Sequence, residues 1–92
     1  MREDTPYIDS FTRAVDATLI RRPGYNVSFK KSHVVACRWL KTQGEAFMPD
    51  ATFRRLLMAV GVDLFEGEWG LALRDMDIEL SAHRELLTQW GR

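Results

Sequence analysis

The sequence has little of what secreted or membrane-spanning proteins need. Its single cysteine, Cys37, cannot form an internal disulfide bond, which suits a reducing compartment. No apolar run reaches the roughly 18 residues of a membrane-spanning helix, and residues 1–9 lack the apolar stretch of a signal peptide. We therefore expect a cytoplasmic protein with no membrane segment.

Motifs of enzymes and of cofactor-binding proteins are also missing. There is no glycine-rich phosphate loop, no nucleophile elbow and no paired His–Cys–Asp pattern. His33 and Cys37 have the four-residue spacing of helical metal ligands, but a structural zinc ion needs four ligands and the only other histidine is His83. We expect a histidine at the flank of a helix and a small buried cysteine, with no metal, no cofactor and no enzymatic activity. The acidic residues that follow Arg74 are typical of a helix start, where acids are favoured: Asp75, Asp77 and Glu79.

The chain does have enough apolar material for one core. Its 92 residues are 46% hydrophobic and 11% aromatic, which fits a single domain over residues 1–92 and is not typical of disorder. The large aromatic residues are expected mostly in that core: Trp39, Phe47, Phe53, Phe65, Trp69 and Trp90.

The zero net charge conceals an uneven distribution. Residues 13–55 carry nine basic and three acidic residues, a net charge of +6. Residues 1–12 carry one basic and three acidic residues (−2), and residues 56–92 carry three basic and seven acidic residues (−4). The basic middle of the chain is therefore the strongest electrostatic signal in the sequence.

The spacing of apolar residues predicts three helices, over residues 6–20, 32–43 and 51–60. Pro6 is expected at the first position of the first helix. The run Arg21-Arg22-Pro23-Gly24 is expected to end that helix in a turn.

The second and third helices have distinct end signals. Ser28 or Ser32 is the candidate N-cap of the second helix, and Gly44 closes it. Asp50 is expected to cap the third helix, and Gly61 to end it. Two capped helices joined by a short link form a unit of helix-turn-helix size.

After Gly61 the apolar period changes. Residues 62–73 are predicted to form a short hairpin around Gly67, although a loop with a short helix stays open for this segment. Residues 76–90 again show helical spacing. The expected fold is therefore mostly α, with a winged-helix-like three-helix core, a short β-hairpin and an added C-terminal helix.

Residues 33–73 resemble winged helix-turn-helix domains, and are similar in particular to the C-terminal domain of phage and viral-type primase-helicases. Residues that pack or end the helices carry this resemblance: Trp39, Leu40, Gly44, Phe53, Leu57 and Gly61. The resemblance implies that the third helix enters the major groove of DNA and that the hairpin contacts phosphates.

Carried over to this chain, the resemblance places Thr52, Arg54, Arg55 and Met58 on the surface that reads DNA. The hairpin departs from the pattern, because it contains Glu66 and Glu68, which would repel phosphate.

The sequence thus predicts a DNA-binding module of a phage or mobile element, acting in replication or transcription control. Base contacts are expected from Thr52, Arg54 and Arg55. Backbone contacts are expected from the basic residues in and before the second helix, with support from Arg21 and Arg22: Lys30, Lys31, Arg38 and Lys41. The partner would be double-stranded DNA, bound by a homodimer formed through the first or last helix.

Other interpretations stay open. These basic side chains could simply form solvated helix faces. A small protein-interaction module or phage inhibitor would instead use the acidic residues 63–85, which mimic the charge of phosphate. A structural adaptor would bind no nucleic acid. A basic block spread around the fold, rather than gathered on one face, would favour the protein-interaction module.

Overall fold

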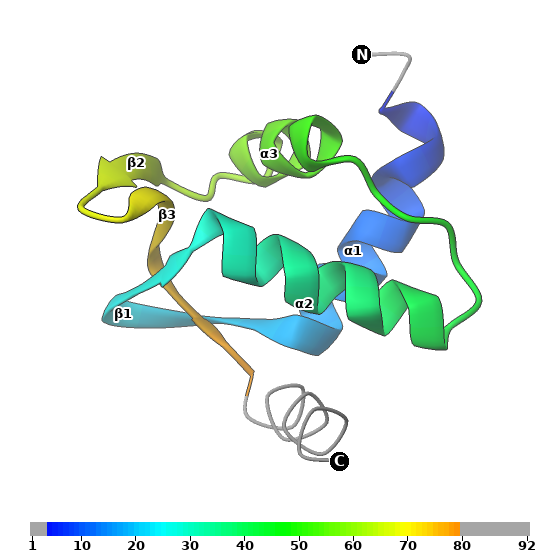
Figure 1. The fold of residues 1–92 in the computed structure, drawn as a ribbon, viewed down its shortest axis with the longest axis horizontal. Helices are drawn as coiled ribbons and strands as arrows, with labels where there is room; N and C mark the ends of the chain where they lie inside the picture. The colour runs from blue at the N-terminus through cyan, green and yellow to red at the C-terminus, as the bar shows by residue number, and fades with distance from the viewer. Residues whose placement is uncertain (1–3, 80–92) are drawn as a thin grey trace.

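Three helices and a three-stranded antiparallel sheet make up the part of the chain that the computed structural model describes, residues 4–79. Figure 1 shows the sheet along one side of the three helices. No helix within these residues is long and apolar enough to cross a membrane. The elements in chain order are a 3-10 turn η1 (Thr5–Tyr7), α1 (Ile8–Thr18), β1 (Leu19–Ser28), α2 (Phe29–Thr42), α3 (Asp50–Ala59), β2 (Leu64–Gly67) and β3 (Gly70–Ile78).

The sheet has the strand order β1-β3-β2, so β3 is central and pairs with both edge strands. The predicted hairpin is present as β2 and β3, but its turn is Glu68-Trp69, between the paired residues Gly67 and Gly70. The other half of the sheet is formed by β1, which runs from Leu19 opposite Ile78 to Ser28 opposite Ala72.

The prediction of a mostly α fold with a three-helix core is therefore wrong, and the fold is mixed α and β. Residues 19–28 form a strand, where the end of the first helix (to residue 20) and the turn over residues 21–24 were expected. The predicted helix over residues 76–90 is contradicted at its start, because Met76–Ile78 complete β3, and its remainder lies outside the described residues. Met76 and Ile78 are both buried and lie two residues apart, which is strand spacing.

A bulge explains why the sequence of β1 does not look like a strand. Arg21 pairs with Met76 and Asn26 pairs with Arg74, so the residues 22–25 lie opposite Asp75 alone. Asp75 has a positive φ of 58°, and its side chain accepts a hydrogen bond of 2.9 Å from the Gly24 amide. Pro23, which has no N–H group, is tolerated because it lies in a bulge on an edge strand.

The core lies between the helices and the sheet, around the ring of Phe53. This side chain is fully buried, and its ring centroid lies 5.7 Å from that of Phe11 in α1 and 5.8 Å from that of Phe29 in α2. The same core contains fully buried apolar side chains from both of the last two helices, their connection and the central strand: Leu40, Met48, Leu57 and Leu73. Each such side chain contributes roughly 1.5–3 kcal/mol by leaving water.

The start of α2 settles which serine is the cap. The Ser28 hydroxyl accepts a 3.0 Å hydrogen bond from the Lys31 amide, so Ser28 is the N-cap and α2 begins at Phe29. Ser32 is buried instead, and its hydroxyl donates to the Ser28 carbonyl. Asp50 does not cap α3 as expected, because Pro49 occupies the N-cap position. Asp50 lies in the first turn, where its negative charge interacts favourably with the helix dipole.

Gly44 and Gly61 end α2 and α3 as predicted, both with positive φ values. After α2, the Gly44 amide donates to the Lys41 carbonyl and the Glu45 amide donates to the Leu40 carbonyl. The same pair of bonds recurs after α3, from the amides of residues 61 and 62. Both helices thus end in a Schellman motif, which satisfies their last carbonyl groups and turns the chain sharply.

Replacing Gly44 by Ala should lower the free energy of unfolding by about 1 kcal/mol, because an L side chain is strained at a φ of +73°. No neighbouring atom would obstruct the added Cβ, so the cost comes from the backbone alone. Gly44→Asn is the matched control and should cost less, since Asn tolerates this conformation. Urea denaturation measures both, and equal stability of the Ala variant and the wild type would contradict the assignment.

Candidate nucleic-acid interface

The four predicted contact residues of α2 share the face of that helix that points away from the core. The buried face is formed by Ser32, Val35, Ala36 and Leu40. On the opposite face, Lys30, Lys31 and Lys41 are exposed and Arg38 is half-buried. The positions 31, 34, 38 and 41 follow one another at intervals of three or four residues. The side chains of Lys31, Arg38 and Lys41 therefore lie in one row along α2, together with Val34.

Arg54 is the predicted contact residue of α3 whose side chain is exposed to solvent and can reach DNA. The core face of α3 is formed by Phe53, Leu56 and Leu57, and Arg54 is exposed on the other side. Met58, one turn further on, is 60% exposed. Together α2 and α3 contain a single acidic residue, Asp50, so their exposed faces are strongly basic.

Thr52 and Arg55 are less available for base contacts than expected, because Thr52 is buried and the half-buried Arg55 is paired with Asp4. The Arg55 guanidinium donates two hydrogen bonds to Asp4, from Nε to Oδ2 at 2.7 Å and from Nη2 to Oδ1 at 2.8 Å. Thr52 is only 4% exposed and also hydrogen-bonds the Asp4 carboxylate. These two residues therefore anchor the start of the chain to α3.

The Asp4 carboxylate is 1% exposed, so its charge must be compensated inside the protein. The hydrogen bonds from Arg55, and then that from Thr52, hold the pKa of Asp4 below its ordinary value against the opposing effect of burial. No local sequence pattern reveals this contact, because Asp4 and Arg55 are 51 residues apart.

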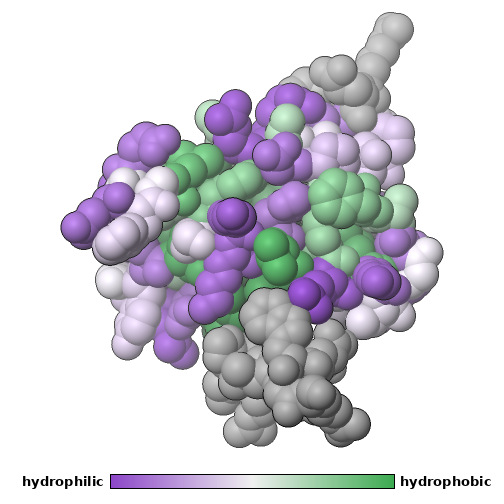
Figure 2. Space-filling model, in the orientation of Figure 1, coloured by the Kyte–Doolittle hydropathy of each residue, from purple (hydrophilic) through white to green (hydrophobic). Residues whose placement is uncertain are grey.

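A groove runs beside the basic face of α2. It has a volume of about 410 Å³ and lies between α2 and the connection that leads to α3. Figure 2 shows apolar residues lying among hydrophilic ones over this part of the molecule. The groove is lined by His33, Val34, Cys37, Arg38, Lys41, Glu45 and Phe47.

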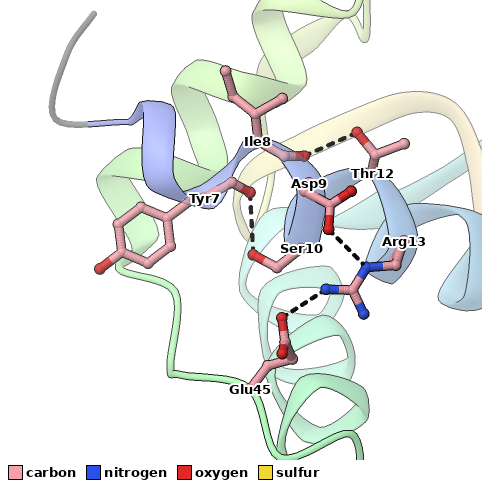
Figure 3. A network of polar contacts seen from close by, with 7 residues as sticks. All are labelled: Tyr7, Ile8, Asp9, Ser10, Thr12, Arg13 and Glu45. Carbon is pink, nitrogen blue, oxygen red and sulfur yellow. Dashed lines mark hydrogen bonds and ion pairs between the residues drawn. The ribbon is translucent and has the colours of Figure 1, made fainter.

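A network of ion pairs holds one wall of the groove (Figure 3). Arg13 of α1 bonds Glu45 at 2.7 Å and Asp9 at 3.1 Å, which ties the α2–α3 connection to α1. The charge of Glu45 is thereby compensated. Phe47 was expected in the core, but its side chain is 66% exposed at the rim of the groove.

His33 and Cys37 both contact a backbone carbonyl group. His33 Nε2 lies 2.6 Å and Cys37 Sγ 3.6 Å from the carbonyl oxygen of Met48, which accepts from both. Burial raises the pKa of the Cys37 thiol, so it stays protonated at neutral pH. Among residues 4–79, no three His, Cys, Asp or Glu side chains are grouped as metal ligands.

Asp75 and Asp77 lie in β3, not at the predicted helix start, and Asp63 lies directly before β2. Asp77 pairs with Arg22 at 3.2 Å, and Asp63 pairs with Arg74 at 2.9 Å. With Asp75 bound to the Gly24 amide, three of these carboxylates are used inside the fold. Glu66 and Glu68 remain exposed at the hairpin, beside Trp69.

Trp69 was expected in the core, and the structure places it at the tip of the hairpin with 91% of its surface exposed. The sequence gives one signal for this position. Trp69 is flanked by Glu68 and Gly70 in a two-residue turn, a place where side chains seldom reach a core.

Replacing Asp4 by Asn should lower the midpoint of thermal unfolding at neutral pH, because the Arg55 guanidinium loses its negatively charged partner. The folded-state pKa of Asp4 is lowered, so its stabilisation is present above the ordinary aspartate pKa. It is lost as the pH falls through the lower folded value. The wild type and Asp4→Asn should therefore converge in acid, as a pH series of unfolding midpoints would show.

Two arginine variants provide the control for this pair. Arg55→Gln should destabilise the fold as Asp4→Asn does, whereas Arg54→Gln should leave the midpoint unchanged. Equal effects of the two arginine variants would contradict the structural role of Arg55.

Comparisons of the chain with protein-family models, with curated proteins and with solved structures found no match. The resemblance of residues 33–73 to winged helix-turn-helix domains therefore stays a prediction, and the function has to be inferred from the chemistry of the surface.

Proposed function

We propose that this chain binds double-stranded DNA through the exposed basic side chains of α2 and α3. This basic surface consists of Lys30, Lys31, Arg38, Lys41 and Arg54. The observation that carries the proposal is that four of these five side chains are not neutralised by an ion pair within the described residues. These four are Lys30, Lys31, Lys41 and Arg54.

The basic surface is suited to phosphate more than to bases. With Thr52 and Arg55 turned toward Asp4, Arg54 is the only side chain on the exposed face of α3 that can bond guanine with two donors. One such contact discriminates by roughly 1–3 kcal/mol at a single base pair. We therefore expect affinity from the DNA backbone and little dependence on base sequence.

The hairpin does not contribute to this binding, since Glu66 and Glu68 are exposed there and would repel phosphate. A DNA-mimicking inhibitor is less well supported, because three carboxylates within residues 63–79 already have partners inside the fold. Two form ion pairs with Arg22 and Arg74, and one accepts a hydrogen bond from the Gly24 amide. We also propose a cytoplasmic location, because a single cysteine suits a reducing compartment. The proposed role in phage or plasmid replication or transcription is based on the resemblance of residues 33–73 to winged helix-turn-helix domains.

Fluorescence anisotropy of labelled duplex DNA, titrated at several salt concentrations, tests the proposal. Each neutralised phosphate contributes ~0.9 to the slope of log Kobs against log salt, so five contacts give a slope of about −4 to −5. The double variant Lys30→Gln/Lys31→Gln should reduce the magnitude of that slope by about 2, and Arg54→Gln by about 1.

Arg74→Gln is the matched control, because it removes the same charge from β3, where Arg74 already pairs with Asp63 outside the groove. It should leave affinity and slope unchanged. Absence of binding by folded protein at low salt would refute the proposal, as would an equal loss in the control.

A further inference from the structure

The hairpin tip exposes a side chain that folded proteins rarely leave in water. Trp69 is 91% exposed in a turn of two residues, so it projects beyond the sheet. Trp is enriched among the residues that dominate protein interfaces, where it fills a pocket on the partner. Its neighbour Glu68 is also exposed, as is Glu66. The tip thus combines a large apolar group with negative charge.

The groove beside α2 has the complementary chemistry. Val34, Cys37 and Phe47 give it apolar walls, and Arg38 and Lys41 give it a basic rim. Its acidic residue, Glu45, is already paired with Arg13. Its volume of about 410 Å³ is within the range of roughly 300–1,000 Å³ that is typical of pockets in proteins. A segment with an aromatic residue next to an acidic one would match this groove, because the aromatic ring suits the apolar walls and the carboxylate suits the basic rim.

We propose that the hairpin tip of one copy of this chain inserts into the groove of a second copy. Trp69 would contact the walls formed by Val34 and Phe47, and Glu68 would lie against the basic rim at Lys41. A second copy is the favoured occupant because its own tip carries both required groups next to each other.

The arrangement of the fold requires two molecules for this contact. Figure 1 shows the β2–β3 turn at one end of the molecule and the α2–α3 connection at the opposite end. A tip therefore cannot reach the groove of its own chain. The contact joins two different surfaces, so a pair of copies held by one contact still has one free groove and one free tip. Assembly then continues past the dimer or closes into a ring.

The contact is expected to be weak. A single hairpin tip buries less than the roughly 1,200 Å² of a stable interface, so association in the micromolar to millimolar range is expected. The inference does not depend on DNA binding. It does share Arg38 and Lys41 with the basic surface, so assembly and DNA would compete for these two side chains.

Sedimentation velocity of the DNA-free protein over a series of concentrations tests the inference. The wild type should show an average mass that rises with concentration, and Trp69→Ala should lower the association constant at least about tenfold. Met58→Ala is the matched control, because Met58 is an exposed apolar residue of α3 outside the tip and the groove. A wild type that stays monomeric throughout, or a Trp69→Ala variant that associates normally, would overturn the inference.

A mixing experiment tests the pairing of tip and groove. Glu68→Lys places a basic tip against its own basic groove, and Lys41→Glu places an acidic groove against its own acidic tip, so each variant alone should associate less. An equimolar mixture should regain association, since the basic tip of one variant then meets the acidic groove of the other. Association of both variants alone at the wild-type level, or no recovery on mixing, would overturn the inference.

Cys37 gives an independent readout, because it lines the groove and is the only cysteine of the chain. Its reaction with a thiol reagent should slow with rising concentration of the wild type and not of Trp69→Ala. Equal rates for the two proteins at high concentration would contradict occupation of the groove.

Discussion

The packing of the Phe53 ring determines which side of α3 faces the solvent. Its centroid lies within 6 Å of the rings of Phe11, Phe29 and His33, so α3 is held against both α1 and α2 at one point. With this ring buried, helical geometry directs Arg54 outward and leaves Thr52 and Arg55 at the border of the core. The composition of the basic surface follows from that rotation.

The border position gives Thr52 and Arg55 a structural role. A buried carboxylate needs hydrogen-bonding partners, and both side chains supply them to Asp4. One consequence is that Asp4 is held against α3. The other is a smaller set of side chains for reading bases, which is why the proposed DNA binding relies on the row of basic residues along α2.

Much of the local structure could be predicted from the sequence, and less of the pairing between distant segments. The glycines that end α2 and α3 act through local backbone geometry, so residues next to them were sufficient to identify both ends. Strand β1 was missed because Pro23 and Gly24 lie in a bulge, and only pairing with β3 makes that segment extended. The basic face of α2 follows from helical spacing, whereas the pairing that occupies Arg55 depends on Asp4, which is 51 residues away.

The most direct test of binding through α2 and α3 is to locate the bound DNA on the protein. Amide chemical shifts of isotope-labelled protein, followed during titration with a short duplex at low salt, report this residue by residue. DNA bound to the basic surface should cause the largest changes around Lys30 and Lys31 and around Arg54, with little change at the hairpin turn. Changes concentrated at Glu66–Trp69, or none in a folded protein at low salt, would contradict DNA binding through this surface.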